Sequence, residues 1–211
     1  MRRMRFSLFA AVALTVAAVW TGVTGEEPDP AAAPVDEGAA FVVLAGGCFW
    51  CVEADFDKVD GVLDTVSGFS GGDVQNPGYK QVTAGGTGHK EVVKIVYDPD
   101  VVSFRTLIDY FFRHVDPLDA GGQFCDRGEA YKTWIFVQGE QERAAAQAAK
   151  ADAARILGAD IVTPIEDFAA FYPAEDDHQD YYMKNPLRYK YYRTACGRDR
   201  RVKALWGDAK S

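Results

Sequence analysis

The sequence feature that most constrains the fold of this chain is a pair of glycines, Gly46 and Gly47, between an apolar run and a helical pattern. Residues 40–46 are typical of a short buried strand, and from residue 49 onward apolar side chains recur at helical spacing. Cys48 therefore lies in the first turn of a helix, where free backbone N–H groups and the helix dipole favour an anion. We expect Cys48 to ionise more readily than an ordinary thiol and to act as a nucleophile.

The residues around this thiol have two interpretations. Phe49 and Trp50 are either core residues or the lining of a pocket for a small apolar part of a substrate. Cys51 completes a Cys-x-x-Cys pair, which is typical of redox or metal chemistry. The chain contains four cysteines, and structural disulfides are an alternative, although a domain of this length does not need them to fold. The four are Cys48, Cys51, Cys125 and Cys196.

The N-terminal segment differs from the rest of the chain. Three arginines precede an uncharged run over residues 6–20, and small residues follow, so residues 1–25 are predicted to be a secretory signal peptide. An uncleaved membrane anchor is the alternative. Residues 26–38 are rich in Pro, Ala and acidic side chains and predict a linker, which leaves 39–211 as one catalytic domain. We expect an exported, periplasmic or extracytoplasmic protein.

The net charge restricts the possible partners. The full chain carries a formal charge of −8, and removal of the arginine-containing leader would make it more negative. An acidic protein is poorly suited to bind nucleic acid or an anionic membrane. Nothing in the sequence indicates an assembly larger than a monomer.

The order of predicted elements is β-α-β-β-α-β. This order is that of the ferredoxin-like, split βαβ fold, an α+β two-layer sandwich with helices on one face of an antiparallel sheet. Ser103 is a plausible N-cap of the second helix. The strands are expected at residues 40–46, 61–70, 91–97 and 131–138, with an extra helix at 140–157, an extra strand at 160–165, and a long C-terminal coil that includes 181–192.

Six segments in the same order give the chain a resemblance to the type A methionine sulfoxide reductases, the peptide-methionine (S)-S-oxide reductases. The segments are GGCFWCVEADF (46–56), GFSGG (68–72), NPGYKQV (76–82), TGHKEVVKIVYDP (87–99), CDRGEAYKTWIF (125–136) and AEDDHQDYYMKNPLRYKYYR (174–193). The resemblance covers nearly the whole domain and implies reduction of methionine-S-sulfoxide, free or in proteins, as repair of oxidative damage. It implies no cofactor.

The resemblance assigns roles to four residues. Cys48 matches the nucleophile, Glu91 matches the general acid, and Tyr79 and Tyr131 match two tyrosines that bind the sulfoxide oxygen. These roles are the ones that sulfoxide reduction requires, because a nucleophile must attack the sulfur and a proton must reach the departing oxygen. Glu91 can supply that proton near neutral pH only if burial raises its pKa.

The resemblance also implies a substrate pocket. Phe49 and Trp50 match the pocket for the methyl group, and Asp126 matches a polar residue in the same site, although an Asp-Arg-Gly sequence alone also suits a turn. Because sulfoxide sulfur is chiral, fixing the methyl group and the oxygen together would select one epimer. In this family the selected epimer is S.

A second thiol is expected to convert the resulting sulfenic acid into a disulfide. We favour Cys196, at the end of the tyrosine-rich tail, over Cys51, while the redox role of Cys125 stays open. The resemblance implies thioredoxin, or a thioredoxin-like donor, as the reductant of that disulfide. His178 is interpreted as a structural histidine and left out of the catalytic set.

Two other classes remain open at this point. A thioredoxin-like disulfide oxidoreductase also places Cys-x-x-Cys at a strand-to-helix junction. A structural zinc domain would draw on the four cysteines and His89, but Cys125 and Cys196 are isolated, which is poor ligand spacing. We therefore predict no metal site.

Overall fold

The computed structural model describes residues 38–207 of the 211-residue chain. The predicted signal peptide, residues 1–25, lies outside the described residues, as does all but the last residue of the predicted linker, 26–38. Within residues 38–207, no helix has both the length and the apolar character needed to cross a membrane.

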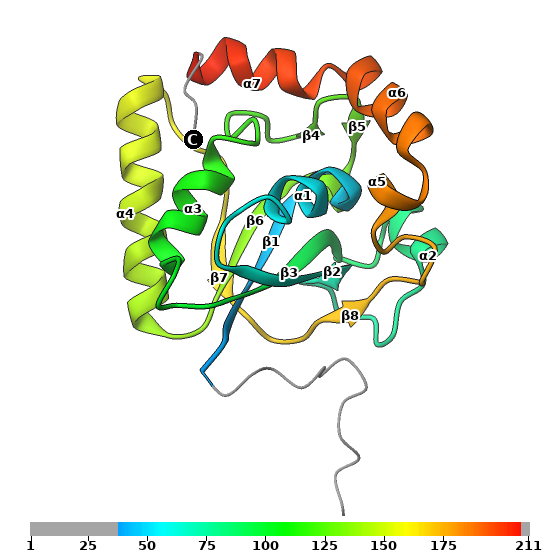
Figure 1. Cartoon of the computed structure of the whole chain (residues 1–211), viewed down its shortest axis with the longest axis horizontal. Helices are drawn as coiled ribbons and strands as arrows, with labels where there is room; N and C mark the ends of the chain where they lie inside the picture. Colours follow the sequence, from blue (N-terminus) through cyan, green and yellow to red (C-terminus); the bar gives the residue numbers. More distant parts are fainter. Residues whose placement is uncertain (1–37, 208–211) are drawn as a thin grey trace, which may run out of the picture.

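A six-stranded sheet forms the centre of the domain (Figure 1). Its strands are β1 (Ala40–Gly46), β2 (Val62–Ser70), β3 (Lys90–Tyr97), β6 (Thr133–Val137), β7 (Ile165–Asp167) and β8 (Tyr172–Pro173). The middle four strands lie in the order β6-β1-β3-β2, and all neighbours among them are antiparallel. At the edges, β7 pairs with β6 in parallel and β8 pairs with β2 in antiparallel.

The connections between these strands match the predicted topology. Helix α1 (Phe49–Phe56) leads from β1 to β2, and helix α3 (Phe104–Phe112) follows β3 on the way to β6. Because β3 lies between β1 and β2, the first unit is a split βαβ, and the ferredoxin-like α+β prediction is confirmed. The predicted cap also forms, since Ser103 Oγ accepts a hydrogen bond from the Thr106 N–H at 3.1 Å.

Most apolar side chains meet between the sheet and the helices on one of its faces. Helix α4 (Glu140–Leu157) joins α1 and α3 there, and its buried face consists of small alanines such as Ala146 and Ala149, which allow close approach. A smaller apolar cluster on the opposite face includes Phe171, from the coil before β8. That coil borders a cavity of about 740 Å³ whose lining includes neither Cys48 nor Glu91.

Two predicted strands form at shifted positions. The strand expected from residue 131 begins at Thr133, because Glu129–Tyr131 forms one turn of 3₁₀ helix. The strand expected at 160–165 forms over Ile165–Asp167 instead. The glycine-rich loop before β3 contains the short helix α2 (Tyr79–Thr83).

The prediction of a C-terminal coil over residues 181–192 is wrong, because this segment is helical. It forms α5 (Tyr181–Lys184), α6 (Pro186–Cys196) and α7 (Arg198–Trp206). Pro186 suits the first turn of α6, and Gly197 ends that helix with a left-handed φ of 71°. No residue of α6 is fully buried, so the helix lacks the apolar stripe from which helices are predicted.

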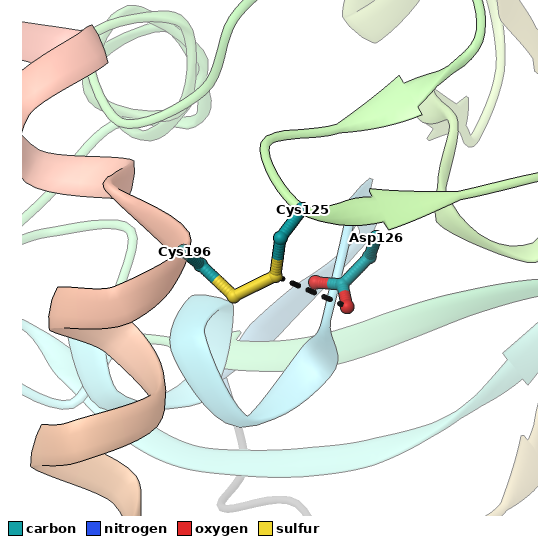
Figure 2. A group of neighbouring side chains, drawn as sticks. All are labelled: Cys125, Asp126 and Cys196. Carbon is teal, nitrogen blue, oxygen red and sulfur yellow. Dashed lines mark hydrogen bonds between the residues drawn. A yellow bond between two sulfur atoms is a disulfide. The ribbon is translucent and has the colours of Figure 1, made fainter.

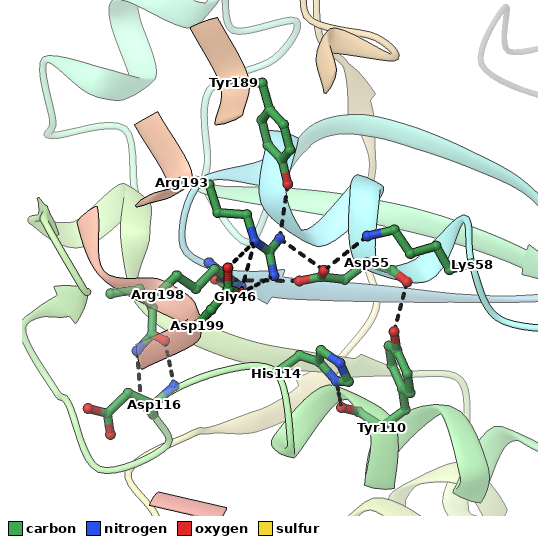
Figure 3. Close-up of polar contacts among 11 residues, drawn as sticks. Gly46, Asp55, Lys58, Tyr110, His114, Asp116, Tyr189, Arg193, Arg198 and Asp199 are labelled. Atoms are coloured by element: carbon green, nitrogen blue, oxygen red, sulfur yellow. Dashed lines mark hydrogen bonds and ion pairs between the residues drawn. The ribbon is translucent and has the colours of Figure 1, made fainter. Parts of the chain in front are cut away.

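Polar contacts with Asp55 attach these helices to the domain (Figure 3). Arg193 Nη1 lies 2.9 Å from Asp55 Oδ1, and Arg198 Nη2 donates to the Gly46 carbonyl at 3.0 Å. Tyr110 on α3 donates to the carbonyl oxygen of Asp55 at 2.9 Å. The C-terminal helices are therefore fixed to α1 and to the end of β1, beside Cys48.

The turn between β1 and α1 requires glycine at position 47, where φ is +85° and an added Cβ would lie 2.5 Å from Gln123 Cβ. Gly85 has the same φ of +85° with nothing within 4 Å of an added Cβ, so Gly85→Ala is the matched control. Urea unfolding should show a loss of about 1 kcal/mol for Gly85→Ala from left-handed backbone alone. Gly47→Ala should lose roughly 2 kcal/mol more from the steric conflict. Equal losses would contradict this account of the turn.

Candidate active site

Cys48 and Cys51 are both free and buried at the start of α1. Cys48 is the N-cap of this helix, and its carbonyl accepts a hydrogen bond from the Cys51 N–H at 3.0 Å. The exposed fractions are 6% for Cys48 and 2% for Cys51. The close turn depends on Gly46, because a Cβ there would lie 2.8 Å from Val52 Cγ2. The sequence therefore places two thiols side by side, shielded from water.

The expectation that Cys48 ionises more readily than an ordinary thiol is wrong. Burial raises the pKa of Cys48 well above its usual value, and the hydrogen bond with Cys51 and the nearby charges of Cys51 and Glu91 raise it further. The same hydrogen bond from Cys48 lowers the pKa of Cys51 to about 7, and Arg198 and Arg193 also lower it. Of the two thiols, Cys51 is thus the one that ionises more readily, and its thiolate can accept the proton of Cys48.

Glu91 lies on β3 directly beside the start of α1. The Phe49 N–H donates to Glu91 Oε2 at 3.0 Å, and the residue is 1% exposed. Among residues 38–207, no group hydrogen-bonds the buried Oε1 of Glu91. Burial raises the pKa of Glu91 to about 8, against the lowering effect of the Phe49 hydrogen bond, and the charges of Asp126 and Cys51 add to the rise. Glu91 is therefore a carboxylic acid at neutral pH, able to donate a proton.

Tyr79 and Tyr131 lie close to this acid. Burial raises the pKa of Tyr79 to about 12 and raises the pKa of Tyr131 further, and the charges of Glu91 and Cys48 contribute to both shifts. The two phenols are within hydrogen-bonding distance of each other. Tyr79 begins α2, where Glu175 fixes the backbone by accepting from the Tyr79 N–H at 3.1 Å. Both phenols are neutral hydrogen-bond donors next to Cys48 and Glu91.

Tyr192 is a site residue that the sequence reasoning missed. Its hydroxyl donates to Asp126 Oδ2, and it lies close enough to Cys48 to affect the pKa of that thiol. Asp126 lies on β5 (Asp126–Arg127), which pairs with β4 (Gly122–Gln123). Burial raises the pKa of Asp126, and it also raises that of Tyr192. The only sequence signal for Tyr192 is its place in the tyrosine-rich segment 174–193, where several tyrosines compete for the role.

Aromatic rings form a wall beside the thiols. Trp50 stacks on Tyr181 with ring centroids 3.7 Å apart, and its indole N–H donates to His178 Nδ1 at 3.2 Å. His178 also stacks on Tyr79 at 4.2 Å, so this histidine holds two predicted site residues in place. Phe49 is only 1% exposed and packs in the core, where its ring centroid is 5.9 Å from that of Phe69. Of the two predicted pocket residues, Trp50 is the one that remains partly exposed.

Cys196, the favoured partner of Cys48, is joined instead to Cys125 by a disulfide (Figure 2). The two Cα atoms are 4.9 Å apart, and Cys125 Sγ lies 3.7 Å from Asp126 Oδ1. This bond links the β4–β5 turn to the end of α6. In this state the thiol in contact with Cys48 is that of Cys51.

The zinc-domain alternative finds no suitable ligand cluster in the described part of the chain. The single group of three potential ligands there is Cys125, Asp126 and Cys196, and its two sulfurs are bonded to each other. His89 lies elsewhere and uses both ring nitrogens on backbone: Nδ1 accepts from the Gly72 N–H at 3.2 Å, and Nε2 lies 2.7 Å from the Val74 carbonyl.

Comparison with known proteins is consistent with this site. Residues 40–210 match the family described as peptide methionine sulfoxide reductase. The peptide methionine sulfoxide reductase MsrA 2 of Rhizobium meliloti is 53% identical over 168 residues, which cover 80% of this chain and 84% of that protein. The structure of reduced Mxr1 from Saccharomyces cerevisiae is similar with a TM-score of 0.68 and 32% identity, covering 72% of this chain and 88% of that one. Methionine sulfoxide reductase A of Corynebacterium diphtheriae gives a TM-score of 0.65 and 34% identity, with coverage of 71% and 76%.

The raised pKa of Glu91 predicts a pH-dependent effect of Glu91→Gln on stability. Because the pKa is about 8 in the folded state and near the ordinary 4.5 in the unfolded state, the folded protein holds the extra proton between these values. The free energy of unfolding should therefore fall as the pH rises through this interval, and Gln should remove that fall. The free energy of unfolding of Glu91→Gln and of the wild type should be measured by chemical unfolding at pH 5 and at pH 8. Between these two pH values, the difference should shift in favour of the variant by on the order of 1 kcal/mol or more. A difference in unfolding free energy that does not change with pH would contradict the raised pKa of Glu91. Glu140→Gln, at an exposed position, is the control for the loss of a carboxylate.

Proposed function

The chain belongs to the peptide methionine sulfoxide reductase family, type A, and from this premise we propose that it reduces methionine-S-sulfoxide, free or in oxidised proteins, to methionine. One observation carries the proposal. A nucleophilic thiol, Cys48, and a protonated carboxylic acid, Glu91, are held side by side by the Phe49 N–H hydrogen bond, and Glu91 Oε1 is buried with no partner among residues 38–207. These are the two groups that reduction of a sulfoxide needs.

The substrate binds with its oxygen and its methyl group in different surroundings. The oxygen lies among the phenols of Tyr79 and Tyr131 and the Glu91 carboxyl, which all carry protons to donate. The methyl group packs against Trp50, whose ring is fixed by Tyr181 and by the hydrogen bond to His178. Because these two sides are fixed relative to Cys48, one epimer alone presents its sulfur to the Cys48 thiolate for attack. This arrangement supports selection of a single epimer, and membership of the family makes S the epimer that we propose.

The first chemical step transfers the oxygen atom. Cys48 loses its proton to the Cys51 thiolate and attacks the sulfoxide sulfur, while Glu91 protonates the oxygen. The S–O bond of the substrate then breaks and the oxygen passes to Cys48 Sγ. The sulfoxide is reduced by two electrons to methionine, and Cys48 is oxidised by two electrons to a sulfenic acid.

Cys51 is the thiol that we propose resolves the sulfenic acid. It hydrogen-bonds Cys48 directly, whereas Cys196 is occupied in the bond to Cys125. Attack of Cys51 on Cys48 Sγ expels the oxygen as water and forms a Cys48–Cys51 disulfide. This assignment reverses the preference for Cys196 drawn from the sequence, which placed that residue after a predicted coil, whereas the segment is helical.

The electron donor that completes the cycle is a thioredoxin or a thioredoxin-like protein in our proposal. Support comes from Mxr1, which is 32% identical to this chain and is also described in a complex with Trx2. We further propose that the enzyme is exported and acts as a monomer, on the evidence of the N-terminal pattern and the acidic charge. The N-terminal sequence of the mature protein and its mass in solution would test these two points.

The activity can be tested without any reductant. Fully reduced protein mixed with methionine-S-sulfoxide should release methionine and lose thiols, and the R epimer should give none. Cys48→Ser should be inactive, and Glu91→Gln should slow the first turnover by about 10²–10⁴ because the oxygen is no longer protonated. If the wild type formed no methionine, the proposed function would be refuted. Equal first-turnover rates for the wild type and Glu91→Gln would refute the role of Glu91 as the general acid.

Cys51→Ser tests the resolving step. This variant should form the sulfenic acid on Cys48, which dimedone would trap and mass spectrometry would locate, and the adduct should be far more abundant than in the wild type. Rapid quenching of the wild type after substrate addition should show a Cys48–Cys51 disulfide as the first disulfide. A Cys48–Cys196 disulfide appearing first would overturn the assignment.

A further inference from the structure

The inner pair of cysteines, Cys48 and Cys51, is almost fully buried, which hinders attack by the thiolate of a protein donor. Thiol–disulfide exchange requires the attacking thiolate to approach a disulfide sulfur directly. Cys48 and Cys51 are 6% and 2% exposed, and the helices that carry Tyr192 and Arg198 lie against them. A disulfide formed between Cys48 and Cys51 would be enclosed by the same groups.

The disulfide between Cys125 and Cys196 is, in contrast, at the surface. Cys125 is exposed and Cys196 is half-buried. Cys196 also lines an open groove of about 390 Å³, together with Phe124 and residues of α7 that include Arg200. A protein thiolate can therefore reach this bond from solvent.

Residues next to both cysteines of the outer disulfide lie close to Cys48 or Cys51. Tyr192 lies one helical turn before Cys196 and close enough to Cys48 to affect the pKa of that thiol. Arg193 and Arg198, on either side of Cys196 in the chain, are close enough to Cys51 for their charges to lower its pKa.

On the Cys125 side, the neighbouring residue Asp126 accepts a hydrogen bond from the hydroxyl of Tyr192. Tyr192 therefore contacts Asp126 and lies close to Cys48, so the turn that carries Cys125 is also near the inner thiols.

We propose that Cys125 and Cys196 form an outer redox pair that accepts electrons from a protein dithiol at the surface and passes them to the buried Cys48–Cys51 disulfide. The proposal rests on the function proposed above. A donor thiolate attacks the outer disulfide, the donor's second thiol closes the donor disulfide, and Cys125 and Cys196 become thiols. These thiols then reduce the inner disulfide in a second exchange, which restores Cys48 and Cys51 and re-forms the outer bond.

A purely structural role explains this disulfide less well, because the C-terminal helices are already attached by other contacts. Arg193 pairs with Asp55 at 2.9 Å, and Arg198 donates to the Gly46 carbonyl at 3.0 Å. On α7, Arg201 lies 2.6 Å from Asp116. Gly197 directly follows Cys196 and separates the two helices, so the end of α6 can shift toward the inner pair once the outer bond is reduced.

The charge around the outer disulfide indicates the kind of donor that fits. From Pro186 to Trp206 the chain contains seven arginines and lysines and one acidic residue, although the whole chain has a net charge of −8. Arg188, Lys190 and Arg200 are exposed on α6 and α7. The complementary partner is a protein dithiol with an acidic surface around its thiols, attracted at low ionic strength.

The number of methionines formed per chain tests the relay. Fully reduced wild type, with four thiols and no reductant, should turn over twice, because the outer pair reduces the inner disulfide once. It should release about two methionines and lose four thiols, whereas Cys125→Ser/Cys196→Ser should release one and lose two. With sulfoxide supplied at half an equivalent per chain, disulfide mapping of the wild type should find mainly Cys125–Cys196. That second readout does not depend on the folding of the variant.

The alternative outcomes are distinct. One methionine from the wild type, with Cys125 and Cys196 still reduced, would overturn the relay and leave the reductase intact. No methionine at all would refute the proposed function instead. In steady state with a thioredoxin, its reductase and NADPH, the double variant should lose at least tenfold more activity than it loses with dithiothreitol, which is small enough to reach the inner pair. Equal losses with both reductants would also overturn the relay.

A charge reversal tests the donor surface. Arg200→Glu should raise the KM for thioredoxin several-fold, and the effect should diminish at high salt. Arg155→Glu on α4, at an exposed position whose pairing partner is Asp152, is the matched control for the same change in net charge. Equal effects of the two variants would overturn the assignment of α6 and α7 as the docking surface.

Discussion

The hydrogen bond from the Phe49 N–H to Glu91 Oε2 joins the first turn of α1 to strand β3. A helix leaves its first N–H groups without partners, and here a carboxyl from the neighbouring strand takes one of them. The register of the sheet brings it there, since Glu91 pairs with Phe69 on β2 and Val93 with Leu44 on β1. Because Cys48 directly precedes Phe49, the same bond places acid and nucleophile together. The cost of burying Glu91 is what keeps it protonated.

The site is completed from the other end of the chain. Tyr192, His178 and Tyr181 all come from the C-terminal segment, and they contact Cys48 or Trp50 on α1. Ion pairs centred on Asp55 hold this segment in place together with the stacking of Tyr181 on Trp50. Asp55 is buried, so pairing with Arg193 and Arg198 is needed to offset the loss of its hydration. Assembly of the active site is therefore coupled to docking of the C-terminal helices.

The topology was predictable from the sequence because its elements follow hydrophobic periodicity, and the position of Glu91 was predictable because a motif marks it. Three features were not. Helix α6 was missed because its contacts are polar, with no buried residue to give a helical period. The protonation of Cys48 was misjudged because the dipole argument omits burial and the neighbouring Cys51. The Cys125–Cys196 bond was missed because four cysteines allow several pairings, and spacing along the chain does not choose among them.

The chemistry of the site depends on Glu91 being a neutral acid in the folded enzyme at neutral pH. Carbon-13 NMR of the glutamate carboxyl carbons, with Glu91 assigned by its absence from Glu91→Gln, would follow its titration directly. The account predicts that this carboxyl is mostly protonated at pH 7 and titrates with a pKa of about 8. A carboxylate that is fully ionised at pH 7 and titrates near the ordinary 4.5 would contradict it.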